Sequence, residues 1–114
     1  MSFTEKLTKT STGNEEIYLK FPNGYCIWVS RESFFIRRKE KIYTALLMKY
    51  KKPHGWNSDT IDVTATCETV YEGITIKRQE TVRLRDVSEQ AVNDFIEQVQ
   101  SLPKICDAPD TWKD

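Results

Sequence analysis

The amino-acid sequence predicts an α+β domain that is mainly β, an antiparallel β-meander sheet followed by one C-terminal amphipathic helix packed on it. Several segments alternate apolar and polar residues, as half-buried strands do, and turn residues separate them. Only one segment, near the C-terminus, has apolar residues at helical spacing. Counting the alternating segments indicates about five to seven strands.

The chain has 114 residues, which fits one domain, and 39% of them are hydrophobic. No apolar run approaches the ~20 residues that span a bilayer, and the N-terminus lacks the apolar stretch of a signal peptide. We therefore expect a small soluble domain in the cytoplasm. Residues 1–14 are expected to form a flexible arm, 15–103 the β-rich domain and 104–114 an irregular tail.

The first two strands are predicted at 15–21 and 25–30, where apolar residues occupy every second position. Pro22, Asn23 and Gly24 lie between them. Proline presets φ, while asparagine and glycine tolerate a positive φ. The two strands should therefore form a hairpin.

The next two segments are less regular. Residues 33–38 are interpreted as a third strand, with Phe34 and Ile36 on one face. Residues 42–51 fit helical and strand templates in part. Their alternation and β-favouring side chains favour a strand, with a helix as the alternative.

The second half of the sheet is predicted from three features. Residues 52–59 contain proline, glycine, asparagine and serine and should form a loop. Residues 60–72 alternate as a half-solvated strand does. Gly73 indicates a turn or bulge, and residues 74–85 fit two short strands or one bent strand.

A helix is predicted at 88–102, because its apolar residues recur at i, i+3, i+4, i+7 and i+10. Ser88 can cap its N-terminus, and Pro103 should end it. The apolar stripe consists of Val92, Phe95, Ile96, Val99 and Leu102.

Apolar residues on both faces of the early strands constrain the assembly. Cys26 and Trp28 alternate with Ile27 and Val29, so neither face of that strand is polar. One helix can cover only one face of the sheet. Either the later strands fold over the other face or a second molecule does, and we expect a homodimer.

The cysteines, Cys26, Cys67 and Cys106, are three in number and widely spaced. With no export signal, they are expected to be free thiols in a reducing compartment. A zinc site would need them to converge with the lone His54, and no CxxC or HxxxH pair supports one. We therefore expect no metal and no cofactor.

Charge is unevenly distributed, although the formal net charge is zero. Residues 31–52 carry eight basic residues against two acidic ones, a net charge of +6. Residues 86–114 carry seven acidic residues against two basic ones, a net charge of −5. This asymmetry suggests that one part of the surface meets anions.

No pattern in the sequence predicts catalysis. His54 has no GxSxG or comparable nucleophile signature near it, and the four glycines form no phosphate-binding loop. Pairs of carboxylates occur, but exposed carboxylates are common on strands. We therefore expect a protein that is not an enzyme.

The basic block favours binding of single-stranded nucleic acid, or of another phosphate polyanion, by a basic and aromatic sheet surface. Such binding needs cations for the phosphates and aromatic faces for the bases. Arg83 and Arg85, with Lys77 and Arg78, could extend this surface. Its predicted cations are Arg37, Arg38, Lys39, Lys41, Lys49, Lys51 and Lys52, and its predicted aromatic residues are Phe35, Tyr43 and Trp56.

Two other interpretations remain open. Basic residues at strand ends also protect sheet edges from aggregation, and the aromatic residues can belong to the core. Alternatively, the chain is a small protein-interaction or inhibitor module. In that case the charge asymmetry steers it to a protein partner.

Overall fold

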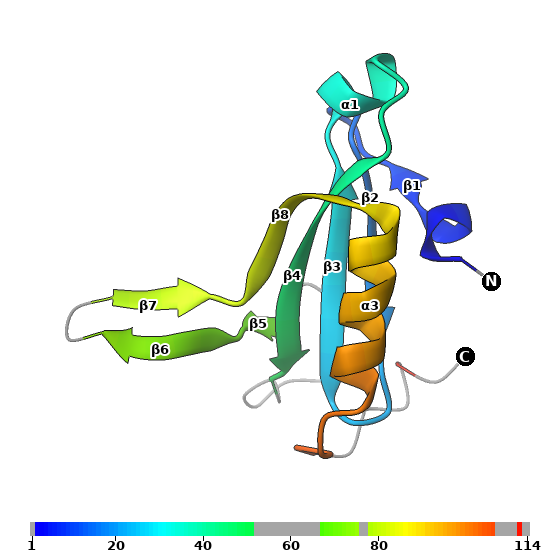
Figure 1. The fold of residues 1–114 in the computed structure, drawn as a ribbon. Helices are drawn as coiled ribbons and strands as arrows, with labels where there is room; N and C mark the ends of the chain where they lie inside the picture. The colour runs from blue at the N-terminus through cyan, green and yellow to red at the C-terminus, as the bar shows by residue number, and fades with distance from the viewer. Residues whose placement is uncertain (1, 52–66, 76–77, 107–111, 113–114) are drawn as a thin grey trace.

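The computed structural model describes residues 2–51, 67–75, 78–106 and 112, of which 72–75 and 78–80 are described by their backbone alone. Six strands form one antiparallel sheet, and a C-terminal helix lies along it (Figure 1). The strand order is β1-β2-β3-β4-β5, and β8 also pairs with β4. The predicted fold class is confirmed. Neither α-helix within the described residues is long and apolar enough to cross a bilayer.

The predicted hairpin is formed by β2 (Glu15–Lys20) and β3 (Tyr25–Arg31). In the turn, the Gly24 N–H donates to the Phe21 carbonyl at 3.2 Å, and the Phe21 N–H donates to the Tyr25 carbonyl at 2.9 Å. Gly24 has a φ of 92°, which a residue without a side chain adopts most easily. The turn therefore forms where the sequence predicted it.

The central strand is β4 (Ile42–Tyr50), so the strand interpretation of this ambiguous segment is confirmed. It pairs antiparallel with β3 at six positions. Its alternate residues Tyr43, Ala45 and Leu47 are buried. A strand puts these three side chains on one face, whereas a helix would spread them around its axis.

The strand predicted at 33–38 is wrong: these residues form the short helix α1 (Ser33–Arg37). The chain must reverse direction between β3 and β4, and α1 makes this connection. Its N–H groups find local acceptors, since those of Phe35 and Ile36 both donate to the Glu32 carbonyl. Apolar alternation over four residues cannot be distinguished from one helical turn by pattern alone.

After β4 come β5 (Cys67–Thr69), β6 (Tyr71–Thr75), β7 (Arg78–Thr81) and β8 (Arg83–Ser88). β6 and β7 form a separate two-stranded hairpin that projects from the sheet (Figure 1). The register shifts at Gly73, which confirms the predicted bulge. The predicted loop at 52–59 and residues 60–66 of the predicted strand lie outside the described residues.

The predicted helix is confirmed as α3 (Glu89–Gln100). The Ser88 side chain accepts a hydrogen bond from the Ala91 N–H at 3.2 Å and caps the N-terminus. Its buried side chains are Val92, Phe95 and Val99.

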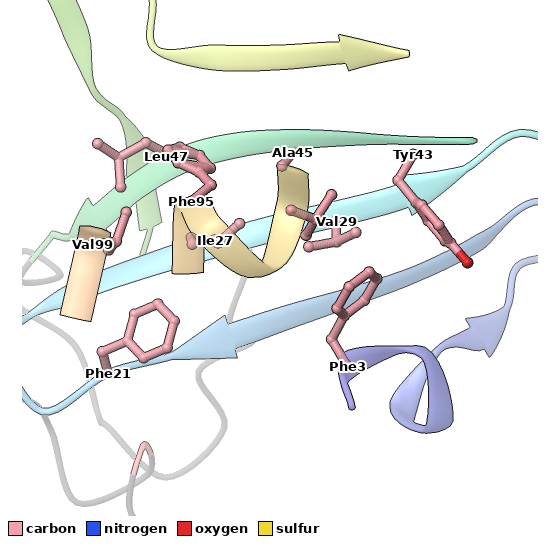
Figure 2. Packing of buried hydrophobic residues seen from close by; sticks show 10 residues of the cluster. Phe3, Phe21, Ile27, Val29, Tyr43, Ala45, Leu47, Phe95 and Val99 are labelled. Carbon is pink, nitrogen blue, oxygen red and sulfur yellow. The ribbon is translucent and has the colours of Figure 1, made fainter. Parts of the chain in front are cut away.

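The core lies between α3 and one face of the sheet (Figure 2). Ile27 and Val29 of β3 are fully buried there. Phe95 of α3 lies over the sheet near Leu47 of β4, as Figure 2 shows. The core side of each central strand is thus the side that meets α3.

In the N-terminal segment, where a flexible arm was predicted for 1–14, the structure describes two short elements. Residues Phe3–Lys6 form the 3₁₀ helix η1, and Thr8–Lys9 form β1, which pairs with the first two residues of β2. Phe3 is only 4% exposed, and its ring meets that of Tyr43 edge to face, with centroids 5.2 Å apart. Phe3, with Leu7 packed beside the core, therefore ties this segment to the core.

Candidate nucleic-acid interface

The face of the sheet opposite α3 carries a row of residues in register. Tyr18 of β2 pairs with Trp28 of β3, which pairs with Leu46 of β4, which pairs with Arg83 of β8. Alternation places these four side chains on the side away from the core, because their neighbours Ile27, Ala45 and others face α3. We call this side the outer sheet face.

Trp28 is held in place on the outer sheet face by a hydrogen bond. Its indole Nε1–H donates to Glu16 Oε2 at 3.1 Å. Glu16 is two residues before Tyr18 on β2, on the same face. Tyr18 and Trp28 are both partly exposed. Two aromatic side chains on neighbouring strands thus stand next to each other on this face.

Cations flank the aromatic pair on both sides. Lys20 lies on the outer face of β2, two residues after Tyr18. Arg83 is exposed on β8, and Arg85, two residues further, is also exposed. The carboxylate of Glu16 is the opposing charge near the row, and it is engaged by Trp28.

Four of the predicted cations gather at the α1 end of the molecule: Arg37, Arg38, Lys39 and Lys41. We call them the α1 tip. Arg38 pairs with Glu40 at 2.9 Å, and its guanidinium lies 5.2 Å from the centre of the Phe34 ring. The other three are exposed, and within the described part of the chain none of them forms an ion pair. The predicted aromatic residue Phe35 is half-buried, whereas Phe34 is 48% exposed.

Lys49 and Lys51 lie at the opposite end of β4. Lys49 pairs with Glu68 of β5 at 3.3 Å, and Lys51 is exposed. β4 has nine residues, so the two basic clusters are separated by about 30 Å of strand. The structure does not bring the predicted cations together at one place. Lys52 and Trp56 lie outside the described residues.

Tyr43 was predicted to stack bases, but it is not on a surface. It is 3% exposed and packs against Phe3. Burial raises the pKa of its phenol, against the opposing effect of the Arg31 guanidinium, which lies 5.9 Å from the ring centre. Tyr43 is one of the odd-numbered residues of β4, and the side chains of these residues share the face of the strand that forms the core.

The sequence prediction missed Tyr18, Trp28 and Lys20. A signal for them was available, since alternation already placed Trp28 opposite Ile27 and Tyr18 opposite Leu19. The missing information was which face the helix covers. A sequence pattern defines two faces of a strand but does not decide which one is buried.

A concave surface, distinct from the α1 tip, runs along β2. It is a groove of about 630 Å³ between β2 and α3, lined by residues 17–22 on one side and by Asn93, Ile96 and Gln100 on the other. We call it the β2–α3 groove. The remaining lining residues are Phe3, Lys6 and Trp112.

Cys26 is fully buried, as expected, with 0% exposure, although it lies two residues from Trp28 on the outer sheet face. A hydrogen bond with Cys67, together with burial, raises the pKa of its thiol. All three cysteines are unpaired by disulfide. Among the described residues, no three His, Cys, Asp or Glu side chains are grouped so that they could hold a metal ion.

Comparisons with protein-family models, with curated proteins and with solved structures find no match for this chain.

Proposed function

We propose that this chain is a non-enzymatic protein that binds single-stranded nucleic acid on its outer sheet face. The observation that carries the proposal is the pairing of Tyr18 with Trp28 in register on neighbouring strands, on the face that α3 leaves uncovered. Sheet-based RNA-binding modules use aromatic side chains on neighbouring strands in the same way.

The aromatic pair supplies stacking energy without sequence preference. Stacking of a base on an aromatic side chain contributes about 1–3 kcal/mol. The Trp28 ring is already oriented by its hydrogen bond to Glu16, so little conformational entropy is lost when a base stacks on it. Leu46 continues the row with an apolar surface toward β8.

The flanking cations define the path that the nucleic acid takes across the sheet. Lys20 lies at the β2 edge, and Arg83 and Arg85 lie on β8 beyond β4. A strand of nucleic acid that crosses β2, β3, β4 and β8 can place phosphates near cations at both ends of the aromatic row. The α1 tip offers further cations to a longer strand.

Trp28→Leu tests the stacking step. We expect it to weaken binding of fluorescein-labelled dT12 by about 5- to 150-fold in fluorescence anisotropy, the equivalent of about 1–3 kcal/mol. Tyr71→Leu is the matched control, because it removes an exposed aromatic ring from β6, which belongs to the separate two-stranded sheet. Circular dichroism verifies the fold of both variants. Equal affinities of wild type and Trp28→Leu would contradict the proposal, as would a wild type that does not bind dT12 at low salt.

The outer sheet face would also support a homodimer, as an alternative to binding nucleic acid. Two copies packed through Trp28 and Leu46 would cover the partly exposed apolar side chains of both. Light scattering at micromolar concentration decides between the forms. A mass near 13.4 kDa contradicts the dimer and leaves the face open to nucleic acid.

A protein-interaction module is the alternative function, and the β2–α3 groove favours it. A groove beside an uncovered strand edge is a common place for a peptide to bind. Three thiols and no disulfide fit a protein that works in the reducing cytoplasm. The two surfaces share Tyr18 and Lys20, which line the groove and also flank Trp28 on the outer sheet face, so the two ligands would compete for them.

A further inference from the structure

We propose that the β2–α3 groove binds an extended peptide segment in which apolar and acidic side chains alternate. The proposal goes beyond nucleic-acid binding and does not depend on it. It follows from the shape of the groove, the edge of β2 and the charge of the lining residues.

The shape of the groove fits an extended chain. Six consecutive residues, 17–22, form one wall, and they span about 20 Å at the rise of a strand. α3 forms the opposite wall with Asn93, Ile96 and Gln100. A volume of about 630 Å³ is within the range of ligand pockets. A long and narrow groove beside a strand suits a peptide in β conformation.

The edge of β2 is only partly covered by β1. β1 pairs with Glu15 and Glu16 alone. Hydrogen-bonded pairs alternate along an antiparallel ladder, and the Phe21 N–H donates to Tyr25 across the hairpin. The N–H and C=O of Lys20 therefore point away from β3, toward the outer edge. A peptide in the groove can pair with this backbone as an added strand.

The charge of the groove selects the peptide. The charged residues among its described lining are Lys6 and Lys20, and both are cationic. Among the described lining residues there is no carboxylate. An acidic segment would gain from both lysines, whereas a basic one would be repelled. The amides of Asn93 and Gln100 can bond main-chain groups of the peptide.

Apolar contacts come from the side chains between these charges. Phe3, Ile96 and Trp112 line the groove. The Trp112 ring packs on Tyr50 with centroids 5.5 Å apart, and its buried indole N–H has no hydrogen-bond partner among the described residues. Because strand side chains alternate, the peptide should present apolar residues at every second position.

The experiment is a selection from a phage library that displays random hexapeptides, on the immobilised full chain. We expect enrichment of sequences that alternate apolar residues with Asp or Glu. A fluorescein-labelled peptide of the enriched sequence is then titrated by fluorescence anisotropy. Gln100→Trp fills the groove and should lower the affinity for this peptide by at least about tenfold. The matched control, Gln98→Trp, is equally exposed on α3 but does not line the groove and should bind as wild type does.

Charge reversal gives the second measurement. Lys6→Glu should lower the affinity for the same peptide by at least about tenfold. Lys9→Glu, on the exposed β1, should leave this affinity unchanged. The proposal is overturned if the library yields no enriched sequence. It is also overturned if the enriched peptides are basic, or if they bind Gln100→Trp and Gln98→Trp equally.

Discussion

The side chain of Asn23 donates a hydrogen bond to the backbone carbonyl of Val99 at 2.8 Å. A second bond from the same amide reaches the Leu102 carbonyl at 3.2 Å, and its oxygen accepts from the Tyr25 N–H. One buried residue of the β2–β3 turn therefore bonds the last turn of α3 and Leu102, which follows the C-cap Ser101. This side chain ties the C-terminal end of the helix to the β2–β3 turn.

Asn23→Ala should destabilise the fold. It removes the buried bond from Asn23 to the Val99 carbonyl, which keeps the Leu102 N–H at 3.2 Å, and the loss of such a bond costs about 0.5–1.5 kcal/mol. For a domain of this size we expect the melting temperature to fall by about 4–8 °C for each kcal/mol. A circular-dichroism melt measures it. Ser101→Ala is the control, since its exposed hydroxyl bonds only the Gln98 carbonyl, and equal melts for the two variants would contradict the role given to Asn23.

Gly24 is the second residue on which the turn depends. A Cβ at this position would lie 2.7 Å from Cys106 Sγ, and the φ is +92°. Gly13 has a similar φ of +87°, but its nearest neighbour would be Ser33 Cβ at 3.7 Å. Both Gly→Ala variants share the strain of a left-handed backbone, about 1–2 kcal/mol, and only Gly24→Ala adds a clash.

Gly24→Ala should therefore destabilise the protein more than Gly13→Ala, by urea denaturation. In a Cys106→Ala background the difference should shrink in part, because the closest atom is removed while Ile105 and the backbone remain near. An unchanged difference would show that Cys106 is not the limiting contact.

The thiols should react in an order set by exposure and pKa. Cys26 is fully buried, and its raised pKa reduces the thiolate fraction at any given pH. Cys106 is partly exposed. Under native conditions iodoacetamide should modify Cys106 before Cys26, and Cys26 should react only after urea is added. Mass spectrometry of tryptic peptides measures this order, and early modification of Cys26 would argue against the burial of this strand.

The salt dependence of dT12 binding should report the cations in contact with phosphates. Arg83→Gln with Arg85→Gln removes two cations of the outer sheet face and should flatten the slope of log K against log salt by up to about two units. Replacing Arg37, Arg38 and Lys39 by Gln tests whether the nucleic acid also reaches the α1 tip.

Both sets of residues are exposed, so the fold should survive. If the tip variant changes the slope and the β8 variant does not, the nucleic acid binds at the tip, and the outer sheet face is not the site.

Local sequence patterns were sufficient to predict the elements whose formation depends mainly on residues close together in the sequence. The stripe from Val92 to Val99 predicts α3, because helical spacing over about two turns has no strand equivalent. The turn at Gly24 predicts the hairpin, because its positive φ favours glycine. β4 was also predicted, from alternation and β-favouring residues against a partial helical pattern.

Only the tertiary structure decided which face of each strand is the core. The alternation that predicted β4 did not indicate whether Tyr43 or its neighbours face α3. The burial of Phe3 and Trp112 depends on partners distant in sequence, Tyr43 and Tyr50. Likewise, the pairing of Tyr18 with Trp28 becomes a candidate site only once α3 is known to lie on the other side. A sequence pattern records the period of an element, whereas burial is a property of what packs against it.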